Sequence, residues 1–156
     1  MSARHDPAAR VPVSVPSATF YVETLGCPKN AVDSDKVVAS LLADGLVAAS
    51  DPSEADVVVV NTCAFIEAAR QESIEVALAL ADVKRPGAKL VVTGCMAERY
   101  GAELAAALPE VNRVAGFGVP VTLGRKPVPS LDLLNLPRPA ALAPWAYVKV
   151  DRKSVV

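Results

Sequence analysis

The sequence predicts a small α/β domain with a doubly wound parallel sheet and helices on both faces. Short apolar runs alternate with segments in which apolar residues recur at helical spacing. This alternation repeats three times between Thr19 and Leu108, and parallel strands need helical crossovers of this kind. A chain of 156 residues, 52% of them hydrophobic, can bury one core of this size.

The first strand and helix are predicted at Thr19 to Thr24 and Asn30 to Ala43. Four apolar residues fall on one face of that helix: Val37, Val38, Leu41 and Leu42. Gly45 follows where helices commonly end, because glycine adopts the left-handed conformation of a helix C-terminus at little cost. These residues therefore form one strand–helix unit.

Two further units follow. Val57 to Asn61 is a β-branched run typical of a strand buried on both faces, and it precedes helical spacing at Ile74, Ala77, Leu78 and Ala81. Lys89 to Thr93 predicts a third strand, followed by helical spacing at Met96, Tyr100, Leu104 and Leu108. We expect a fourth short strand within Arg113 to Val121.

The composition divides the chain into four segments. Residues 1–17 read as a disordered N-terminal tail, and residues 18–124 carry the α/β domain. Residues 125–144 are rich in proline and read as a linker, while residues 145–156 resemble the opening of another domain with Trp145 in its packing.

The charge balance and apolar pattern exclude several classes of protein. Sixteen basic and seventeen acidic residues leave a net charge of -1, which favours neither nucleic acid nor an anionic membrane. No segment has the length of a signal peptide core or a membrane span, so a cytoplasmic location is expected. The single histidine, His5, lies in the predicted tail and is a poor catalytic candidate.

Three cysteines, Cys27, Cys63 and Cys95, each follow a predicted strand and precede a predicted helix. The carboxyl ends of parallel strands share one edge, so the three thiols should gather there, and helix N-termini should lower their pKa values. Zinc sites usually have closely spaced cysteine pairs, which this chain lacks, whereas iron–sulfur clusters are held by thiolates. Three unrelated buried cysteines remain an alternative.

Polar residues near the cysteines have two interpretations each. Asn30, Asp33 and Ser34 suit either helix capping, which we favour, or ordering of a cluster loop. Asn61 and Thr62 suit either turn formation or donation to sulfur. Four charged residues are expected on a solvated helix face: Glu67, Arg70, Glu72 and Glu75.

Three segments, "TLGCPKNAVDSD", "VVVVNTCAFIEAARQES" and "LVVTGCMAERY", resemble the cysteine motifs of the N-terminal domain of radical S-adenosylmethionine methylthiotransferases. The resemblance covers about Phe20 to Gly118, and "GCPKN" is most similar to the RimO branch. It implies that Cys27, Cys63 and Cys95 bind one auxiliary 4Fe-4S cluster. It assigns no catalytic residue in this chain.

The resemblance also implies a substrate. RimO-like enzymes add a methylthio group to an aspartate of a small-subunit ribosomal protein, using S-adenosylmethionine and a second 4Fe-4S cluster on a Cys-x-x-x-Cys-x-x-Cys motif. That motif does not occur in these 156 residues, so the chain resembles a truncated and catalytically incomplete enzyme. Neither membrane nor direct nucleic-acid binding is expected.

Three alternatives stay open at this point. The chain could derive from a tRNA methylthiotransferase, it could be a thiol or sulfur carrier with one free cysteine, or it could be a doubly wound binding module whose cysteines are simply buried. An assay for iron and acid-labile sulfide separates the cluster hypothesis from the last two.

Overall fold

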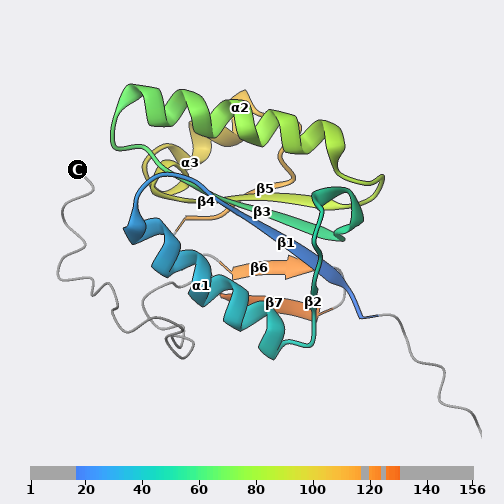
Figure 1. Cartoon of the computed structure of the whole chain (residues 1–156). Coiled ribbons are helices and arrows are strands. Elements are labelled where there is room, and N and C mark those ends of the chain that lie inside the picture. The colour runs from blue at the N-terminus through green and yellow to red at the C-terminus, as the bar shows by residue number, and fades with distance from the viewer. Residues whose placement is uncertain (1–16, 117–119, 124–125, 131–156) are drawn as a thin grey trace, which may run out of the picture.

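The computed structural model describes residues 17–116, 120–123 and 126–130. Its main feature is a five-stranded sheet in the order β2-β1-β3-β4-β5, in which every neighbouring pair is parallel (Figure 1). The strands of this sheet are β1 (Thr19–Thr24), β2 (Val47–Ala48), β3 (Val57–Thr62), β4 (Lys89–Gly94) and β5 (Arg113–Val114). The predicted doubly wound parallel fold is confirmed.

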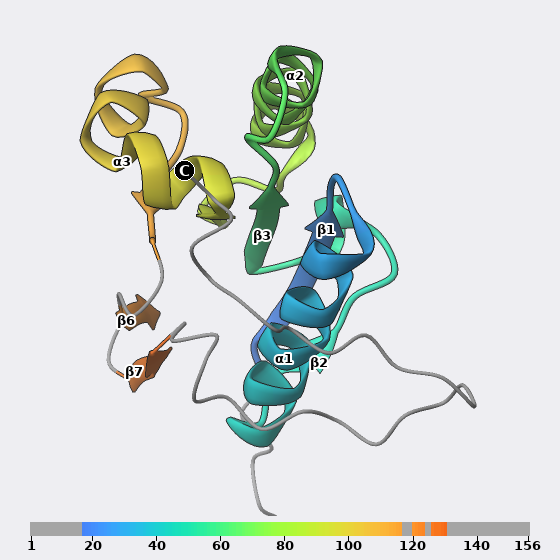
Figure 2. The ribbon, with the colours of Figure 1, turned by 90° about the vertical axis from the view of Figure 1, so that its left-hand side faces the viewer.

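Helices cover both faces of the sheet, as predicted. They are α1 (Pro28–Ala43), α2 (Glu67–Val83) and α3 (Cys95–Ala107). Val37 and Leu41 of α1 pack against Val57, Val59 and Val91 on one face. The opposite face is covered by α2 and α3, and Figure 2 shows these two helices on the side of the sheet away from α1.

The central strand β3 is buried along its whole length, which explains its unbroken run of valines. Val58 and Val60 face the α2 side, whereas Val57 and Val59 face the α1 side. Alternate residues of a strand point to opposite faces, so a strand with helices on both sides favours apolar residues at consecutive positions, as in Val57 to Val60. The expectation for this segment is therefore confirmed.

The edges of the sheet differ from the prediction. β2 was not predicted, since two exposed residues are too few to show a pattern. The strand expected within Arg113 to Val121 is confirmed only as the two-residue β5, although the Ala115 N–H extends the pairing by donating to the Val92 carbonyl at 2.8 Å. A short 3-10 helix, Pro52–Glu54, joins β2 to β3.

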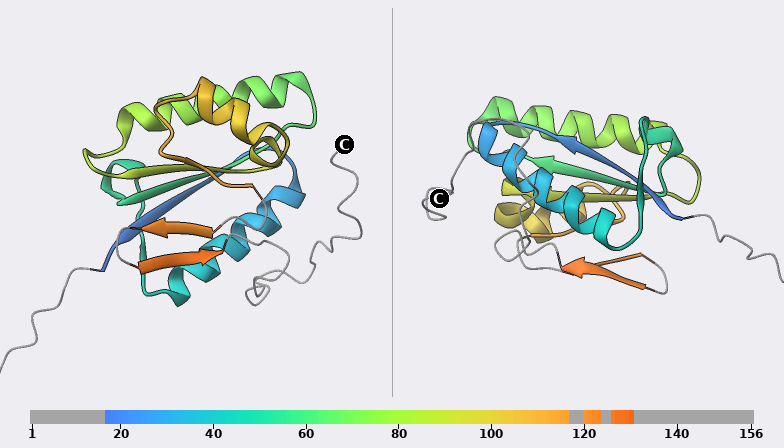
Figure 3. Two further views of the ribbon diagram at one scale, coloured as in Figure 1. Left: turned by 180° about the vertical axis from the view of Figure 1, so that it is seen from behind. Right: turned by 60° about the horizontal axis from the view of Figure 1, so that its bottom comes forward.

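A separate antiparallel pair consists of β6 (Pro120–Leu123) and β7 (Lys126–Ser130), on the α1 side of the sheet (Figure 3). β7 lies within the segment expected to be a linker, and the sequence analysis did not predict this pairing. The rest of that segment, residues 1–16 of the expected tail with His5, and the segment with Trp145 lie outside the described residues. The three boundaries between the four expected segments stay predictions.

The order of the strands creates a switch point between β1 and β3. From β1 the chain crosses through α1 to β2 on one side, and from β3 it proceeds through β4 to β5 on the other. Ligands of open α/β sheets bind outside the carboxyl ends of the strands at such a point. No helix within the described residues combines the length and hydropathy needed to cross a bilayer.

Candidate metal centre

The three cysteines lie at the carboxyl ends of β1, β3 and β4, as predicted. Thr62 and Gly94 are paired at the ends of β3 and β4. Cys63 and Cys95 directly follow these residues, so they lie side by side where the chain leaves the sheet. The β1 ladder continues one residue beyond Thr24, because the Leu25 N–H donates to the Asn61 carbonyl at 3.0 Å. Cys27 follows two residues later.

We call the three strand-to-helix junctions, residues 25–27, 62–66 and 94–95, the first, second and third cysteine loops. The first turns at Gly26, whose φ of +86° favours glycine. A Cβ atom at this position would lie 2.6 Å from Cys63 Cβ and 2.9 Å from Cys63 Sγ. The backbone of the first loop therefore contacts the second cysteine directly. Cys27 is exposed and occupies the N-cap position of α1, followed by Pro28 in the first turn.

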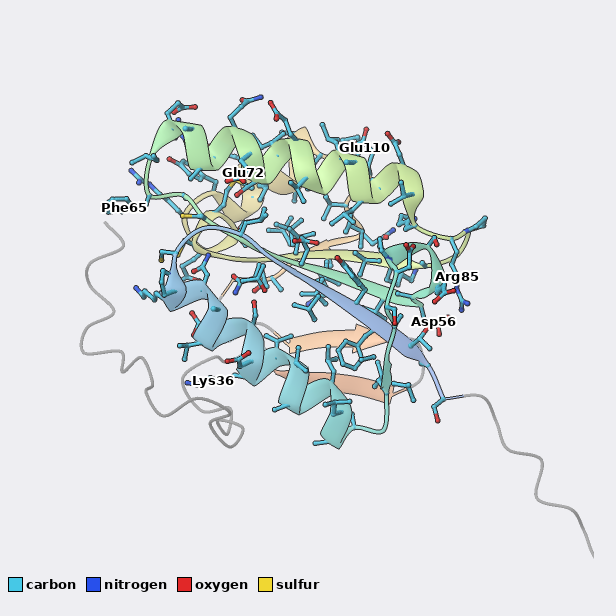
Figure 4. The ribbon with its side chains drawn as sticks, viewed as in Figure 1. Lys36, Asp56, Phe65, Glu72, Arg85 and Glu110 are labelled. Atoms are coloured by element: carbon cyan, nitrogen blue, oxygen red, sulfur yellow. The ribbon has the colours of Figure 1, made fainter. Side chains whose placement is uncertain are left out.

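The second cysteine, Cys63, is buried between β3 and α2. Ser73 of α2 holds its backbone, since Ser73 Oγ accepts from the Cys63 N–H at 3.2 Å and lies 3.1 Å from the Cys63 carbonyl oxygen, to which it can donate. Phe65 follows in the same loop and is 84% exposed, pointing outward at this end of the sheet in Figure 4. Sequence reasoning missed Ser73, because nothing in its local pattern distinguishes it.

The third cysteine is half-buried and is the first residue of α3. Gly94 precedes it with φ +92° and ψ -161°, a region of backbone conformation that is essentially restricted to glycine. A Cβ atom on Gly94 would lie 2.3 Å from Asn61 Oδ1 and 2.5 Å from the Thr62 carbonyl oxygen. The second and third cysteine loops are thus packed backbone to backbone.

The polar residues of the first motif are not helix caps, so the favoured interpretation was wrong. Asn30, Asp33 and Ser34 are buried inside α1, and the N-cap is Cys27, with no side-chain hydrogen bond at that cap. Asn30 Nδ2 donates to the Leu25 and Thr62 carbonyls, and Thr24 Oγ1 donates to Ser34 Oγ at 2.7 Å. Asn30 and Ser34 face the sheet, because the ends of β1 and β3 offer them polar partners.

Asn61 and Thr62, for which turn formation and donation to sulfur were both left open, are not turn residues. Both are buried in β3, where Asn61 Nδ2 donates to the Asn30 carbonyl at 2.9 Å and Thr62 Oγ1 donates to the Thr93 carbonyl at 2.6 Å. Among the described residues, the buried Asn61 Oδ1 and Thr93 Oγ1 have no hydrogen-bond partner. The region around the three cysteine loops therefore contains unsatisfied polar atoms, which are uncommon in protein interiors.

The electrostatics of Cys95 differ from the expectation of a lowered pKa. Burial raises the pKa of the Cys95 thiol, Lys29 opposes this change, and the nearby Cys63 and Cys27 raise the pKa further. Burial outweighs the positive charge because the charged thiolate loses water that Lys29 does not replace. Lys29, which sequence reasoning did not single out, is the basic residue that acts on this thiol.

The charged face expected on α2 is confirmed for three of its four residues. Glu67, Glu72 and Glu75 are exposed, whereas Arg70 is half-buried. Arg70 forms an ion pair with Glu67 and donates to the Tyr100 hydroxyl of α3 at 2.6 Å. Arg70 therefore joins α2 to α3 instead of facing solvent alone.

The donor set suits a cluster better than a single ion. Within the described residues, no group of three or more Cys, His, Asp or Glu side chains is arranged to hold one metal ion. In an iron–sulfur cluster each thiolate binds a separate iron, so the sulfur atoms are not required to converge on one point. The glycines at 26 and 94 let the cysteine loops approach one another closely, because a Cβ atom at either position would overlap Cys63 or the end of β3.

The fold and the cysteine edge define a doubly wound α/β domain in which three loops bring thiols from distant parts of the chain together. Residues 19–116 match the sequence family described as "Uncharacterized protein family UPF0004". The chain belongs to this family. The match spans the sheet and all three cysteine loops.

Several curated relatives carry the name "Ribosomal protein uS12 methylthiotransferase RimO". The protein of Anaeromyxobacter sp. (strain K) is 52% identical over 100 residues, which cover 63% of this chain and 21% of that relative. The Myxococcus xanthus (strain DK1622) protein is 40% identical over 148 residues, covering 85% and 31%. The Salinispora tropica protein is 54% identical over 94 residues, covering 60% and 18%.

The predicted resemblance to RimO-like methylthiotransferases is thereby confirmed. The chain spans between 18% and 31% of the length of these relatives. The activity and substrate in their names are therefore properties of those proteins.

Proposed function

We propose that Cys27, Cys63 and Cys95 hold one auxiliary 4Fe-4S cluster, and that this domain serves a methylthiotransferase acting on an aspartate of ribosomal protein uS12. The observation that carries the proposal is the meeting of three cysteine loops at the switch point of the sheet. The names of the relatives support the substrate class. The cytoplasmic location stays a prediction.

The exposure of the thiols argues against the alternative of three cysteines buried in the core. Only Cys63 is buried, while Cys27 is exposed and Cys95 is half-buried. A cysteine that merely fills a core behaves as a small apolar side chain and needs no access to solvent. Thiols that bind a group outside the strand ends need such access on one side.

The chain's own residues would bind and orient the group. Three thiolates would ligate it, Ser73 would keep the Cys63 backbone in place, and Lys29 would offset part of the negative charge at Cys95. A cluster held by three thiolates instead of four supplies one iron without a protein ligand.

The test is anaerobic reconstitution of the chain and its single cysteine variants, followed by absorption and electron paramagnetic resonance spectroscopy. Cys27→Ala, Cys63→Ala and Cys95→Ala should each lose most of the cluster, because two thiolates hold it poorly. Val83→Ala, an exposed change at the end of α2, should retain it. Full retention in all three cysteine variants would refute the proposal.

This chain alone should not methylthiolate uS12, even with S-adenosylmethionine and a reductant. All three of its cysteines are assigned to one site, and the cofactor chemistry needs a second cluster. Mass spectrometry of uS12 and a search for 5′-deoxyadenosine test this. Either product above a cluster-free control would show that the allocation of cysteines is wrong.

A further inference from the structure

Asn30 is the side chain on which all three cysteine loops converge. It is 1% exposed, lies in the first turn of α1 and is not one of the three proposed cysteine ligands. We infer that Asn30 is a positioning residue that fixes the three thiols relative to one another. This inference rests on the proposed function, which it deepens by naming the group that organises the site.

The amide nitrogen of Asn30 connects the first two loops. Nδ2 donates to the Leu25 carbonyl at 2.9 Å and to the Thr62 carbonyl at 3.0 Å. The first carbonyl lies two residues before Cys27, and the second directly precedes Cys63. A carboxamide nitrogen has two N–H groups, so both donors are used and both loops are held by one group.

The use of both donors determines where the amide oxygen lies. With Nδ2 bound to two carbonyl oxygens, Oδ1 is directed to the third loop, where the protonated Cys95 thiol of the cluster-free protein donates to it over 3.8 Å. The orientation of the amide follows from this network, since the reverse orientation would place an oxygen against two carbonyl oxygens. One side chain thus contacts the first and second loops through nitrogen and the third through oxygen.

The backbone of Asn30 is itself fixed at both of its polar groups. Its N–H donates to the Cys27 carbonyl at 2.9 Å, and its carbonyl accepts from Asn61 Nδ2 at 2.9 Å. Asn61 belongs to the central strand, the most buried element of the sheet. The side chain of Asn30 therefore starts from a rigid point, which is the requirement for a group that positions others.

Removing the amide should affect loops that are distant in sequence. The Leu25 and Thr62 carbonyls would lose a buried donor at the same time, and unpaired buried polar groups are costly. The hydrogen bonds of the Asn30 side chain reach all three cysteine loops. A change at Asn30 should therefore alter several thiols at once.

The experiment compares Asn30→Ala and Asn30→Asp with the wild-type chain by site-resolved alkylation of the reduced apo protein. Asn30→Asp keeps the size of the side chain but, as a carboxylate, cannot donate. Val37→Ala is the control, because Val37 is fully buried two turns further along α1 and its truncation lowers stability away from the loops. Exposed Cys27 serves as the internal reference.

We expect alkylation of Cys63 relative to Cys27 to rise at least tenfold in both Asn30 variants, and that of Cys95 to rise similarly in Asn30→Ala. Val37→Ala should change both ratios less than twofold. Ratios within twofold of wild type in the Asn30 variants would overturn the inference, as would an equal rise in Val37→Ala, which would indicate a general loss of stability. If Asn30→Ala does not fold, the Cys63 ratio in the isosteric Asn30→Asp decides.

A second readout uses the reconstituted protein. The Asn30 variants should shift the electron paramagnetic resonance spectrum and shorten cluster retention at least fivefold, whereas Val37→Ala should keep the wild-type spectrum. An unchanged spectrum and retention in the Asn30 variants would overturn the inference. If the wild-type chain binds no cluster, the proposed function fails, while the alkylation ratios still test the role of Asn30 separately.

Discussion

Gly94→Ala should be far more destabilising than a glycine change of similar φ elsewhere in the domain. Gly94 combines φ +92° with contacts that a Cβ atom would make at 2.3 Å and 2.5 Å. Non-glycine residues in this conformation cost about 1–3 kcal/mol, and overpacking costs about 1–3 kcal/mol more. Gly87→Ala is the matched control, because Gly87 has φ +84° but nothing within 4 Å of its Cβ position.

The control should lose only the conformational part, about 1–2 kcal/mol. Both changes remove the same freedom from the unfolded chain, so that effect cancels in the comparison. We expect Gly94→Ala to be less stable than Gly87→Ala by about 2–3 kcal/mol, which at a slope of about 2 kcal/mol/M lowers the urea midpoint by about 1–1.5 M. The assay is urea unfolding followed by circular dichroism, and equal midpoints for the two variants would refute the packing of the second and third loops described above.

Two other predictions concern exposure and pH. Phe65→Ala should change the free energy of unfolding by no more than about 0.5 kcal/mol, because Phe65 is 84% exposed. Phe20→Ala should lower it by about 3–5 kcal/mol, because Phe20 is 2% exposed. Thermal unfolding compares the two variants, and similar losses of stability would contradict the different burial of the two side chains. The Tyr21 hydroxyl donates to Glu23 Oε2 at 2.7 Å, and this hydrogen bond raises the pKa of Tyr21 from 10.0 to about 12. The hydrogen bond therefore stabilises the fold fully below pH 10, and this stabilisation is lost as the pH rises through 12. In Glu23→Gln an ultraviolet titration should show Tyr21 ionising closer to its usual pKa, and an unchanged titration would exclude Glu23 as the cause.

The strands and the placement of the cysteines could be predicted because they depend on local pattern. The run from Val57 to Val60 is apolar at every position only because helices cover both faces. A cysteine that follows each of three parallel strands must lie at their common carboxyl edge, whatever the details of packing. The resemblance to a known family was likewise carried by these motifs.

The burial of Asn30 could not be predicted, because Thr62 and Cys95, two of its hydrogen-bond partners, are distant in sequence. A polar residue near a helix start has the local pattern of a cap, and its burial depends on the Thr62 carbonyl, which lies 32 positions away. The raised pKa of Cys95 has the same origin, since burial by the folded chain outweighs any effect of the helix start. β2 escaped prediction for a different reason, because a two-residue edge strand has no period to detect.

The ion pair between Asp56 and Arg85 lies at the amino ends of the strands, opposite the cysteines. These residues lie at the amino end of β3 and in the loop before β4, away from Phe65 in Figure 4. Both ion-pair side chains are substantially exposed, and exposed pairs contribute little to stability. The Asp56–Arg85 pair is therefore expected to contribute little to the free energy of unfolding.

Cluster binding is tested most directly by the iron and acid-labile sulfide content of the 156-residue chain after anaerobic reconstitution, measured beside a variant in which Cys27, Cys63 and Cys95 are all alanine. We predict equal amounts of iron and sulfide, about four of each per wild-type chain, and almost none in the triple variant. Similar iron and sulfide in both proteins, or none in a wild-type chain shown by circular dichroism to be folded, would contradict this prediction.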